Sequence, residues 1–263
     1  MQKTVVVSPT YNEAENLPVL AAELWALQFP GLSILVVDGG STDGTDRIAD
    51  ELAARRPNEL AALHLSGRGG LRRAYLVAFK WALAHEAKRI VQMDCDFSHS
   101  PSFVPQMLES SKHADLVVGS RYVAGGKLDP RMGTARYLQS WWANEVYARL
   151  ILNLRLQDVT SSFRCWRASA LERIDLDAIG SNGYSFQIEM AYIAEKSGYR
   201  VIEIPIQYEE RRVGRSKLRL SAKFEAAWRT WEILWRYRDF SPEPDTTSRP
   251  AEQPRNGHRP PGA

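Results

Sequence analysis

The chain has 263 residues, of which 44% are hydrophobic and 25% charged, and its 34 basic and 31 acidic residues give a formal net charge of +3. These proportions belong to an ordinary globular protein and exclude collagen-like, disulfide-scaffold and wholly disordered classes. The balanced charge does not indicate a nucleic-acid binder, so we expect no nucleic acid among its partners. It leaves room for local anion sites.

Three features predict a cytoplasmic protein without an integral anchor. No run reaches the roughly 18–20 apolar residues that a membrane-spanning helix requires. The N-terminus passes from a short β-branched run directly into polar residues, without the apolar core of a signal peptide. The only two cysteines, Cys95 and Cys165, are too few for a disulfide framework, which fits a reducing compartment.

Short β-rich runs alternate with helical patterns through the first half of the chain. This alternation predicts an α/β fold on a mostly parallel sheet. Ligands of such sheets bind beyond the carboxyl ends of the strands, so the segments that follow the strands are candidate sites. Strands are expected at 4–8, 33–38, 61–65, 89–94 and 115–119, and helices near 13–27, 45–56, 70–85 and 102–111.

The second half of the chain is less regular. Residues 241–263 include six prolines and no Ile, Leu, Val, Met or aromatic residue, so they cannot bury a core. We expect residues 1–240 to form one domain and the remainder a disordered tail. The elements expected in the second half are helices near 136–154, near 185–197 and up to about 240, a strand near 200–205, an irregular stretch near 158–164 and a basic loop at 209–217.

Asp94 and Asp96 stand two residues apart at the end of the apolar strand IVQM. Side chains two apart in a strand share a face, so both carboxylates can approach one divalent cation. Oxygen ligands suit Mg²⁺ or Mn²⁺, which commonly bridge carboxylates to substrate phosphates. The alternative is a pair of solvated aspartates, because so short a motif is not specific by itself.

Asp38 ends the second strand in the segment VVDGGSTDGT. A ligand role for Asp38 requires neighbouring carboxylates, which Asp94 and Asp96 would supply. Otherwise the segment is a strand-to-helix turn in which Asp43 caps the helix beginning near Thr45. The glycine-rich stretch at 67–74 matches neither the dinucleotide fingerprint nor the Walker pattern, so a P-loop is rejected.

Other polar residues near these strand ends allow two interpretations each. His99 is either a metal ligand or a loop residue that caps the next helix, whereas Cys95 is expected to pack in the core. Guanidinium groups in loops can bind phosphate oxygens bidentately, but most such groups are solvated surface charges. These basic residues therefore indicate a phosphate-bearing substrate only in combination with an acidic metal site. The basic residues concerned are Arg121, Arg136, Arg211, Arg212, Arg215 and Lys217.

Seven motifs occur in one order over residues 5–220: PTYNE, VVDGGSTDGT, QMDCDFSHSP, GSRY, DVTSSFR, GYSFQIEM and RRVGRSK. As a set they resemble the family-2 glycosyltransferases of GT-A (Rossmann-like) fold, and within them the dolichol-phosphate or polyprenyl-phosphate mannosyltransferase branch. The resemblance implies that residues 1–240 are a catalytic domain. In that family a nucleotide sugar, usually GDP-mannose, donates its sugar with inversion to the phosphate of a polyprenyl or dolichyl lipid.

The resemblance also implies roles for individual residues. The cofactor, Mg²⁺ or Mn²⁺, would be held by Asp94, Asp96 and Gln187. The nucleotide pocket would be formed by Pro9, Tyr11, Glu13 and Asp38, with Asp94 beside them. Arg211 and Lys217 would close over the donor diphosphate. The acceptor phosphate would be received by Arg121, Arg136 and Ser140, so that Asp96 and Arg121 act directly in catalysis.

The sequence departs from the family at several positions. The family usually has aspartate where Gly39 stands, glycine where Ser162 stands and glutamate where Arg215 stands. Gly39 weakens the implication of a guanine base, so one alternative is a UDP-sugar-dependent, glucosyl or related transferase acting on polyprenyl phosphate or a soluble acceptor. Another alternative is a catalytically weakened protein that binds a nucleotide or lipid phosphate.

Two tryptophan-bearing helices are the expected route to a lipid acceptor. A tryptophan face flanked by arginines suits the membrane interface, whereas the alternative is an aromatic stripe packed on the domain. We expect peripheral association with the cytoplasmic face of a membrane, directly or through a membrane-anchoring partner protein. The residues concerned are Trp141 and Trp142 in the first helix, and Phe224, Trp228, Trp231 and Trp235 in the last.

Overall fold

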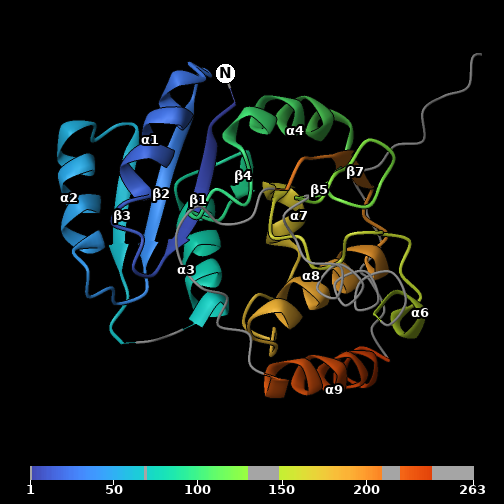
Figure 1. Cartoon of the computed structure of the whole chain (residues 1–263). Helices are drawn as coiled ribbons and strands as arrows, with labels where there is room; N and C mark the ends of the chain where they lie inside the picture. Colours follow the sequence, from blue (N-terminus) through green and yellow to red (C-terminus); the bar gives the residue numbers. More distant parts are fainter. Residues whose placement is uncertain (1, 68–69, 130–147, 209–219, 239–263) are drawn as a thin grey trace, which may run out of the picture.

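The computed structural model describes residues 2–67, 70–129, 148–208 and 220–238 (Figure 1). The side chains of 220–227 are not part of that description. Four of the expected site residues lie outside the described ranges, as do the expected tail at 241–263 and most of the expected helix at 136–154. These four are Arg136, Ser140, Arg211 and Lys217.

A seven-stranded sheet in the order β3-β2-β1-β4-β6-β5-β7 forms the centre of the described structure. All neighbouring strands pair in parallel except β6, which is antiparallel to both β4 and β5. The expectation of a mostly parallel sheet is therefore confirmed. The strands are β1 (Thr4–Thr10), β2 (Leu32–Asp38), β3 (Leu60–His64), β4 (Arg89–Gln92), β5 (Leu116–Ser120), β6 (Arg164–Arg167) and β7 (Val201–Pro205).

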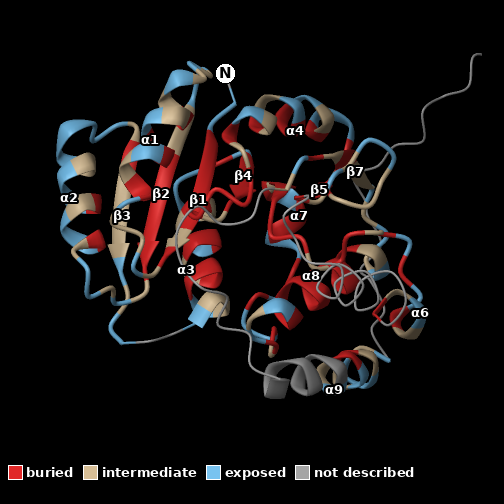
Figure 2. Ribbon diagram, in the orientation of Figure 1, coloured by how far each residue is buried: buried red, intermediate tan, exposed pale blue. Residues whose placement is uncertain are grey.

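Helices cover both faces of the sheet, and the buried strands lie between them (Figure 2). Successive residues of β1 point to opposite faces: Val5 and Val7 pack with α3 and α8, whereas Val6 packs with α1, α2 and α4. The helices are α1 (Leu17–Ala26), α2 (Thr45–Arg55), α3 (Gly70–Ala84), α4 (Val104–Ser110), α6 (Arg149–Leu152), α7 (Ala168–Glu172), α8 (Tyr184–Lys196) and α9 (Leu220–Arg236), with short 3₁₀ helices at Pro101–Phe103 and Ser111–His113.

The sequence analysis predicts no strand at β6, whose first residue, Arg164, ends the stretch expected to be irregular. Arg164 has no exposed surface, yet a charged residue at this position reads as loop. Its guanidinium donates to the carbonyls of Ser161 at 2.8 Å and Val159 at 2.9 Å, so a buried cation holds the turn that precedes the strand. Burial lowers the pKa of Arg164 to about 10.

The last helix packs on the domain by one face and exposes its tryptophans on the other. Thr230 and Ile233 are each 1% exposed, whereas Trp228, Trp231 and Trp235 are 73%, 53% and 68% exposed. At 100° per residue these tryptophans share one side of the helix, opposite the packed residues. The alternative of an aromatic stripe packed on the domain is therefore wrong for these three residues.

Buried Glu189 of α8 fixes the end of α9. Its carboxylate accepts hydrogen bonds at 2.9 Å from Arg236 Nη1 and from the Tyr237 hydroxyl, and at 2.7 Å from the backbone N–H of Ser181. A carboxylate without exposed surface is stable only with such donors. This contact sets which side of α9 faces the protein.

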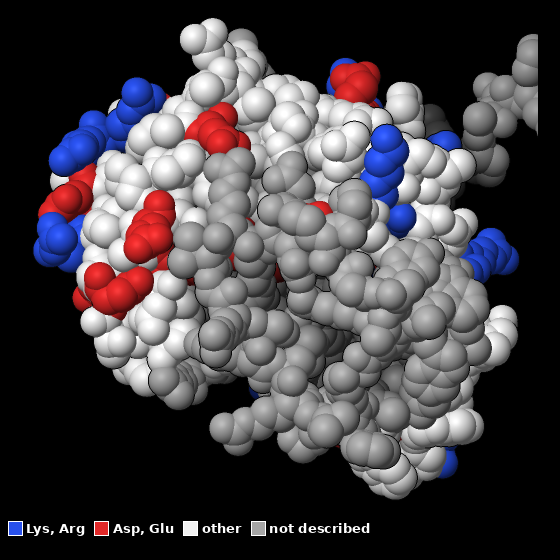
Figure 3. Space-filling model, in the orientation of Figure 1, with Lys and Arg blue, Asp and Glu red and all other residues white. Residues whose placement is uncertain are grey.

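The distribution of charged side chains over the surface agrees with the nearly balanced charge of the sequence. In Figure 3 acidic and basic side chains are interspersed over the part of the molecule where α2 lies, where Arg47 and Glu51 pair one turn apart. Within the described ranges, no helix combines the length and apolar character needed to cross a bilayer.

Candidate active site

The carboxyl ends of β1, β2 and β4 bring three expected site segments together. Strand β1 lies between β2 and β4, with Thr10 opposite Asp38 and Val7 opposite Gln92. The chain that follows β1 is therefore flanked by Asp38 on one side and by Asp94 on the other. This is the edge at which parallel α/β sheets bind ligands.

The loops after β1 and β2 are bound to each other. The backbone N–H of Asn12 donates to Ser41 Oγ at 2.8 Å, and the N–H of Thr42 donates to Asn12 Oδ1 at 2.9 Å. The N–H of Glu13 donates to Thr45 Oγ1 at 2.9 Å, which ties the first loop to the start of α2. The loop that carries Tyr11 and Glu13, which follows Pro9 at the end of β1, is thus one structural unit with the Asp38 loop.

Asp38 is 2% exposed, and its carboxylate organises its own turn. It accepts the backbone N–H groups of Gly40 at 3.0 Å and Ser41 at 2.9 Å, and the Thr10 hydroxyl at 3.2 Å. A Cβ added at Gly39 would lie 3.3 Å from the Thr10 carbonyl oxygen and 3.9 Å from a ring carbon of Tyr11. Any side chain at position 39 would therefore make a tight contact with the Thr10 carbonyl that glycine avoids.

Asp43 supports the start of α2, although the N-cap residue is Gly44 and not Asp43 as expected. Its Oδ1 accepts the backbone N–H of Thr45 at 3.0 Å, and its Oδ2 accepts the N–H of Ala14 at 3.1 Å. Burial alone raises the pKa of Asp43, but the hydrogen bonds from Thr45 and Ala14 outweigh it and leave the pKa lowered. The same carboxylate thus binds the first residue of α2 and joins the two loops.

Asp94 and Asp96 follow β4 and face different partners. Asp94 accepts the Tyr75 hydroxyl on Oδ1 at 3.0 Å and the Ser162 hydroxyl on Oδ2 at 2.7 Å. Asp96 is 5% exposed and accepts the backbone N–H of Ser98 at 3.1 Å. Cys95 between them is buried in the core under α1 and α4, as expected.

Gln187 is the third expected metal ligand, and its amide is unusual. The side chain is 1% exposed, and neither Oε1 nor Nε2 has a hydrogen-bond partner among the described residues. An unpaired buried amide costs free energy, which a cation at its oxygen would offset. Gln187 follows Phe186, whose ring stacks on Tyr75 at 5.9 Å, and Tyr75 in turn bonds Asp94.

These residues fit a hard divalent cation by the chemistry of their donor atoms. No group of three or more His, Cys, Asp or Glu side chains in the described ranges is arranged to hold a metal. Two carboxylates and one amide oxygen do not need such a group, because Mg²⁺ commonly takes one or two carboxylates and completes its shell with water and substrate phosphate.

His99 is buried beside the candidate metal residues rather than on a solvated loop. Its ring stacks on Phe163 at 5.0 Å and meets Tyr208 edge-on at 6.3 Å. Burial lowers the pKa of His99, although Asp94 and Asp96 act in the opposite direction, so the ring is neutral at pH 7. The expectation that His99 caps the next helix is wrong, since Ser100 accepts the N–H of Ser102 there.

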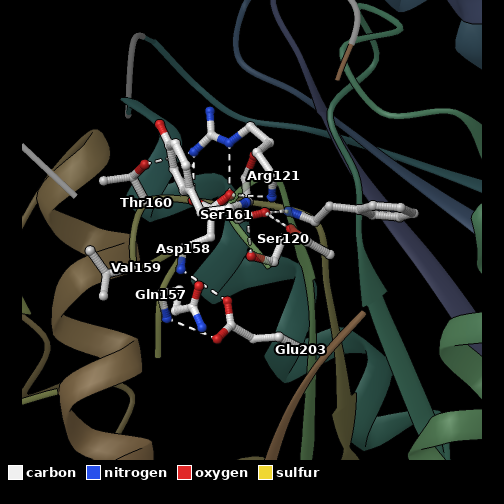
Figure 4. A network of polar contacts seen from close by, with 12 residues as sticks. Ser120, Arg121, Gln157, Asp158, Val159, Thr160, Ser161 and Glu203 are labelled. Atoms are coloured by element: carbon white, nitrogen blue, oxygen red, sulfur yellow. Dashed lines mark hydrogen bonds and ion pairs between the residues drawn. The ribbon is translucent and has the colours of Figure 1, made fainter. Parts of the chain in front are cut away.

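Arg121 lies after β5 and is held by a buried carboxylate (Figure 4). Asp158, with no exposed surface, accepts Arg121 Nε at 2.7 Å and Nη2 at 2.6 Å, and also the backbone N–H of Arg121 at 2.9 Å. Burial opposes the charged form, but Asp158 outweighs it and keeps the pKa of Arg121 above its ordinary value. Nη1 makes no hydrogen bond to a described residue and points away from Asp158 in Figure 4.

Glu203 of β7 positions the segment that carries Asp158. Its carboxylate accepts the backbone N–H groups of Gln157 at 2.8 Å and Asp158 at 3.0 Å (Figure 4). No role was predicted for Glu203, Asp158 or Tyr75. The DVTSSFR motif was a signal for Asp158, whereas Tyr75 and Glu203 stand in ordinary amphipathic patterns that carry no such signal.

Two solved structures show the same architecture. Glucosyl-3-phosphoglycerate synthase from Mycobacterium tuberculosis, in complex with Mn²⁺ and uridine-diphosphate-glucose, matches with a TM-score of 0.62 at 17% identity, covering 89% of this chain and 79% of that one. S. aureus TarS in complex with UDP-GlcNAc matches with a TM-score of 0.54 at 20% identity, covering 91% and 74%. At these identities the likeness establishes the fold alone, and the expected α/β GT-A architecture is confirmed.

Two sequence relatives are much closer. A polyprenol monophosphomannose synthase from Mycolicibacterium smegmatis is 40% identical over 232 residues, which cover 88% of this chain and 86% of that protein. An undecaprenyl-phosphate mannosyltransferase from Micrococcus luteus is 42% identical over 216 residues, which cover 82% and 87%. The model of the family described as "Glycosyl transferase family 2" matches residues 5–175. With its strand-end carboxylates and these relatives, the chain belongs to glycosyl transferase family 2, and within it the relatives support the polyprenyl-phosphate mannosyltransferase branch.

Proposed function

We propose that the protein transfers mannose, with inversion, from GDP-mannose to the phosphate of a polyprenyl lipid. The observation that carries this proposal is the pair Asp94 and Asp96 at the carboxyl edge of the sheet, in a chain about two-fifths identical to two polyprenyl-phosphate mannosyltransferases. In this reaction an acceptor phosphate oxygen bonds to the anomeric carbon. The bond from that carbon to the diphosphate breaks, and its electron pair leaves with the nucleoside diphosphate.

The main chemical requirement is to stabilise the leaving group. A lipid phosphate with a second pKa near ~6 is mostly dianionic at neutral pH, so no strong protein base is needed. Asp94, Asp96 and Gln187 would hold Mg²⁺ or Mn²⁺, and the bound ion supplies Lewis-acid stabilisation of the diphosphate. Arg211 and Lys217, outside the described residues, are proposed to contact the same diphosphate.

Arg121 is proposed to orient the acceptor phosphate. Asp158 fixes the guanidinium through Nε and Nη2, which leaves Nη1 directed away from the ion pair. A guanidinium held in this way loses little side-chain entropy when it binds an anion. Arg136 and Ser140 are proposed as its partners in the acceptor site, and Tyr11 with the Asp38 loop as the nucleotide side.

A donor and acceptor screen tests this function. The protein is incubated with GDP-mannose, UDP-glucose or UDP-GlcNAc and either undecaprenyl phosphate or a soluble sugar, with and without EDTA, and lipid-linked sugar is measured. The proposal expects transfer from GDP-mannose to the lipid that EDTA abolishes and Mn²⁺ or Mg²⁺ restores. Faster transfer from UDP-glucose would favour the alternative suggested by Gly39, and faster transfer to the soluble sugar would exclude the lipid acceptor.

The exposed face of α9 supports a place for the reaction at a membrane surface. Trp228, Trp231 and Trp235 share the outer side of the helix, and the Arg238 guanidinium lies 5.0 Å from the ring of Trp235. Tryptophan with flanking arginine favours the lipid headgroup region. We propose peripheral docking at the cytoplasmic leaflet, directly or with a membrane-anchoring partner protein.

Replacing Trp228, Trp231 and Trp235 together by alanine is expected to weaken binding to anionic lipid vesicles by at least about 100-fold, because each tryptophan that enters the headgroup region contributes on the order of 1–2 kcal/mol. Vesicle co-sedimentation measures the binding. Trp25 on α1, which is only partly exposed and lies under the Arg56 guanidinium at 4.4 Å, provides the matched control Trp25→Phe. Equal binding of the triple variant and the wild type would contradict docking by this face.

A further inference from the structure

Both carboxylate oxygens of Asp94 are occupied by hydroxyl donors from distant parts of the chain. Tyr75, in α3, donates to Oδ1 at 3.0 Å, and Ser162, just before β6, donates to Oδ2 at 2.7 Å. Two donors on opposite oxygens fix the rotation of a carboxylate as well as its position. Asp94 is therefore oriented by residues outside its own loop.

The Tyr75 hydroxyl has a fixed position because its ring is buried against two other aromatic rings. Tyr75 has no exposed surface, and its ring stacks on Phe79 and on Phe186, with 5.9 Å between centroids in each pair. Phe186 immediately precedes Gln187 in α8. The same aromatic stack thus connects Asp94 with the helix that carries the third candidate ligand.

The Ser162 hydroxyl is fixed by the backbone on either side of it. The Ser161 hydroxyl donates to the Gly119 carbonyl at 2.7 Å, and the N–H of Gly119 donates to the Phe163 carbonyl at 2.8 Å. Ser162 is held between these two contacts to β5 and is 9% exposed. A glycine at this position would leave Asp94 Oδ2 without this donor.

The two hydroxyls leave Asp94 able to bind a cation. Each carboxylate oxygen has two lone pairs, and a single hydroxyl donor uses one of them. The remaining lone pairs keep a direction set by Tyr75 and Ser162. Hydrogen bonds of this kind to metal-binding carboxylates commonly change metal affinity by about 10–100-fold.

We infer that Tyr75 and Ser162 are positioning residues that orient the Asp94 carboxylate for a divalent cation and thereby strengthen cation binding. This inference rests on the proposed function only in assigning the cation to Asp94. It adds two residues, from α3 and from the turn before β6, on which the affinity of the site depends.

Manganese titration followed by electron paramagnetic resonance of free Mn²⁺ tests the inference without measuring catalysis. The full chain is titrated with Mn²⁺, with and without GDP, as wild type, Ser162→Ala, Ser162→Thr and Tyr75→Phe. Ser162→Ala and Tyr75→Phe are expected to raise the dissociation constant by about tenfold each. Ser162→Thr keeps the hydroxyl and is expected to stay within about twofold of wild type.

Two matched control variants each delete a tyrosine or serine hydroxyl that does not contact Asp94. Tyr199→Phe deletes a hydroxyl that donates to the Ala170 carbonyl at 2.9 Å, and Ser102→Ala deletes one in the 3₁₀ helix Pro101–Phe103 whose hydrogen bond within the described ranges is to Ser100 Oγ. Both are expected to bind Mn²⁺ as the wild type does. In transfer assays, Ser162→Ala should raise the Mn²⁺ concentration for half-maximal rate and leave the KM for lipid phosphate unchanged.

The outcomes separate this inference from the proposed function. Unchanged Mn²⁺ affinity in both Ser162→Ala and Tyr75→Phe overturns the positioning role and leaves the proposed function intact. A wild type that binds no Mn²⁺ even with GDP overturns the metal assignment and the inference together. The expected losses of affinity in a protein that transfers no mannose would support the inference and refute the proposed substrates.

Discussion

Asp96→Asn is expected to lower the rate of sugar transfer by about 10³-fold, roughly 4 kcal/mol of transition-state stabilisation. Asparagine has the same size and keeps an oxygen that can accept the N–H of Ser98, so the loop after β4 should keep its shape. The variant lacks the charge that would hold the cation against the donor diphosphate. Single-turnover transfer from GDP-mannose at saturating Mn²⁺ measures the effect.

Asp177→Asn is the matched control for this prediction. Its carboxylate is 79% exposed and contacts Lys80 on the surface, so its removal should leave the rate within about twofold of wild type. Circular dichroism and the unfolding midpoint establish that both variants are folded. Retention of more than a tenth of the wild-type rate by Asp96→Asn would show that Asp96 does not hold the reacting groups.

Asp158→Ala is expected to lower the free energy of unfolding by roughly 3–5 kcal/mol. Asp158 has no exposed side-chain surface and the Arg121 side chain is only 12% exposed, so the variant leaves a guanidinium buried without its carboxylate. The variant also removes the acceptor for the backbone N–H of Arg121. Urea unfolding followed by tryptophan fluorescence measures the loss.

Removal of both charges distinguishes a buried ion pair from simple loss of packing. The double variant Arg121→Met with Asp158→Leu is expected to recover most of the lost stability, because no unpaired charge stays buried. Asp177→Ala, which breaks the exposed pair with Lys80, should cost less than ~1 kcal/mol. A loss in Asp158→Ala no greater than in Asp177→Ala would contradict a structural role for this pair.

The strand-end carboxylates can be predicted from the sequence, whereas the residues that orient them cannot. Asp94 and Asp96 follow an apolar run, and the strand-end rule for parallel sheets is enough to place them at one edge. Tyr75 lies on the packed face of α3 and reads as core, and Ser162 reads as loop. Their hydroxyls meet Asp94 across 19 and 68 positions of sequence, and such contacts have no local pattern.

Arg121 and α9 are two further cases in which contacts between distant residues could not be predicted from the sequence. The sequence indicated a basic residue after β5, but its bidentate carboxylate, Asp158, is 37 positions away. The period of the tryptophans in α9 indicated an amphipathic helix without indicating which face packs. That choice follows from Glu189, which holds Arg236 and Tyr237 and turns the tryptophans outward.

The sequence by itself determined the alternation of strands and helices in the first half of the chain, the mostly parallel α/β class and the acidic edge at Asp94 and Asp96, because periodicity and strand ends are local properties. Only the tertiary structure decided that β6 enters the sheet in the opposite direction and that the Arg164 cation is buried in its turn. Only the tertiary structure, too, supplied the donors that orient Asp94. Packing brings together side chains that are distant in the chain, and hydrogen bonds between them depend on position in space.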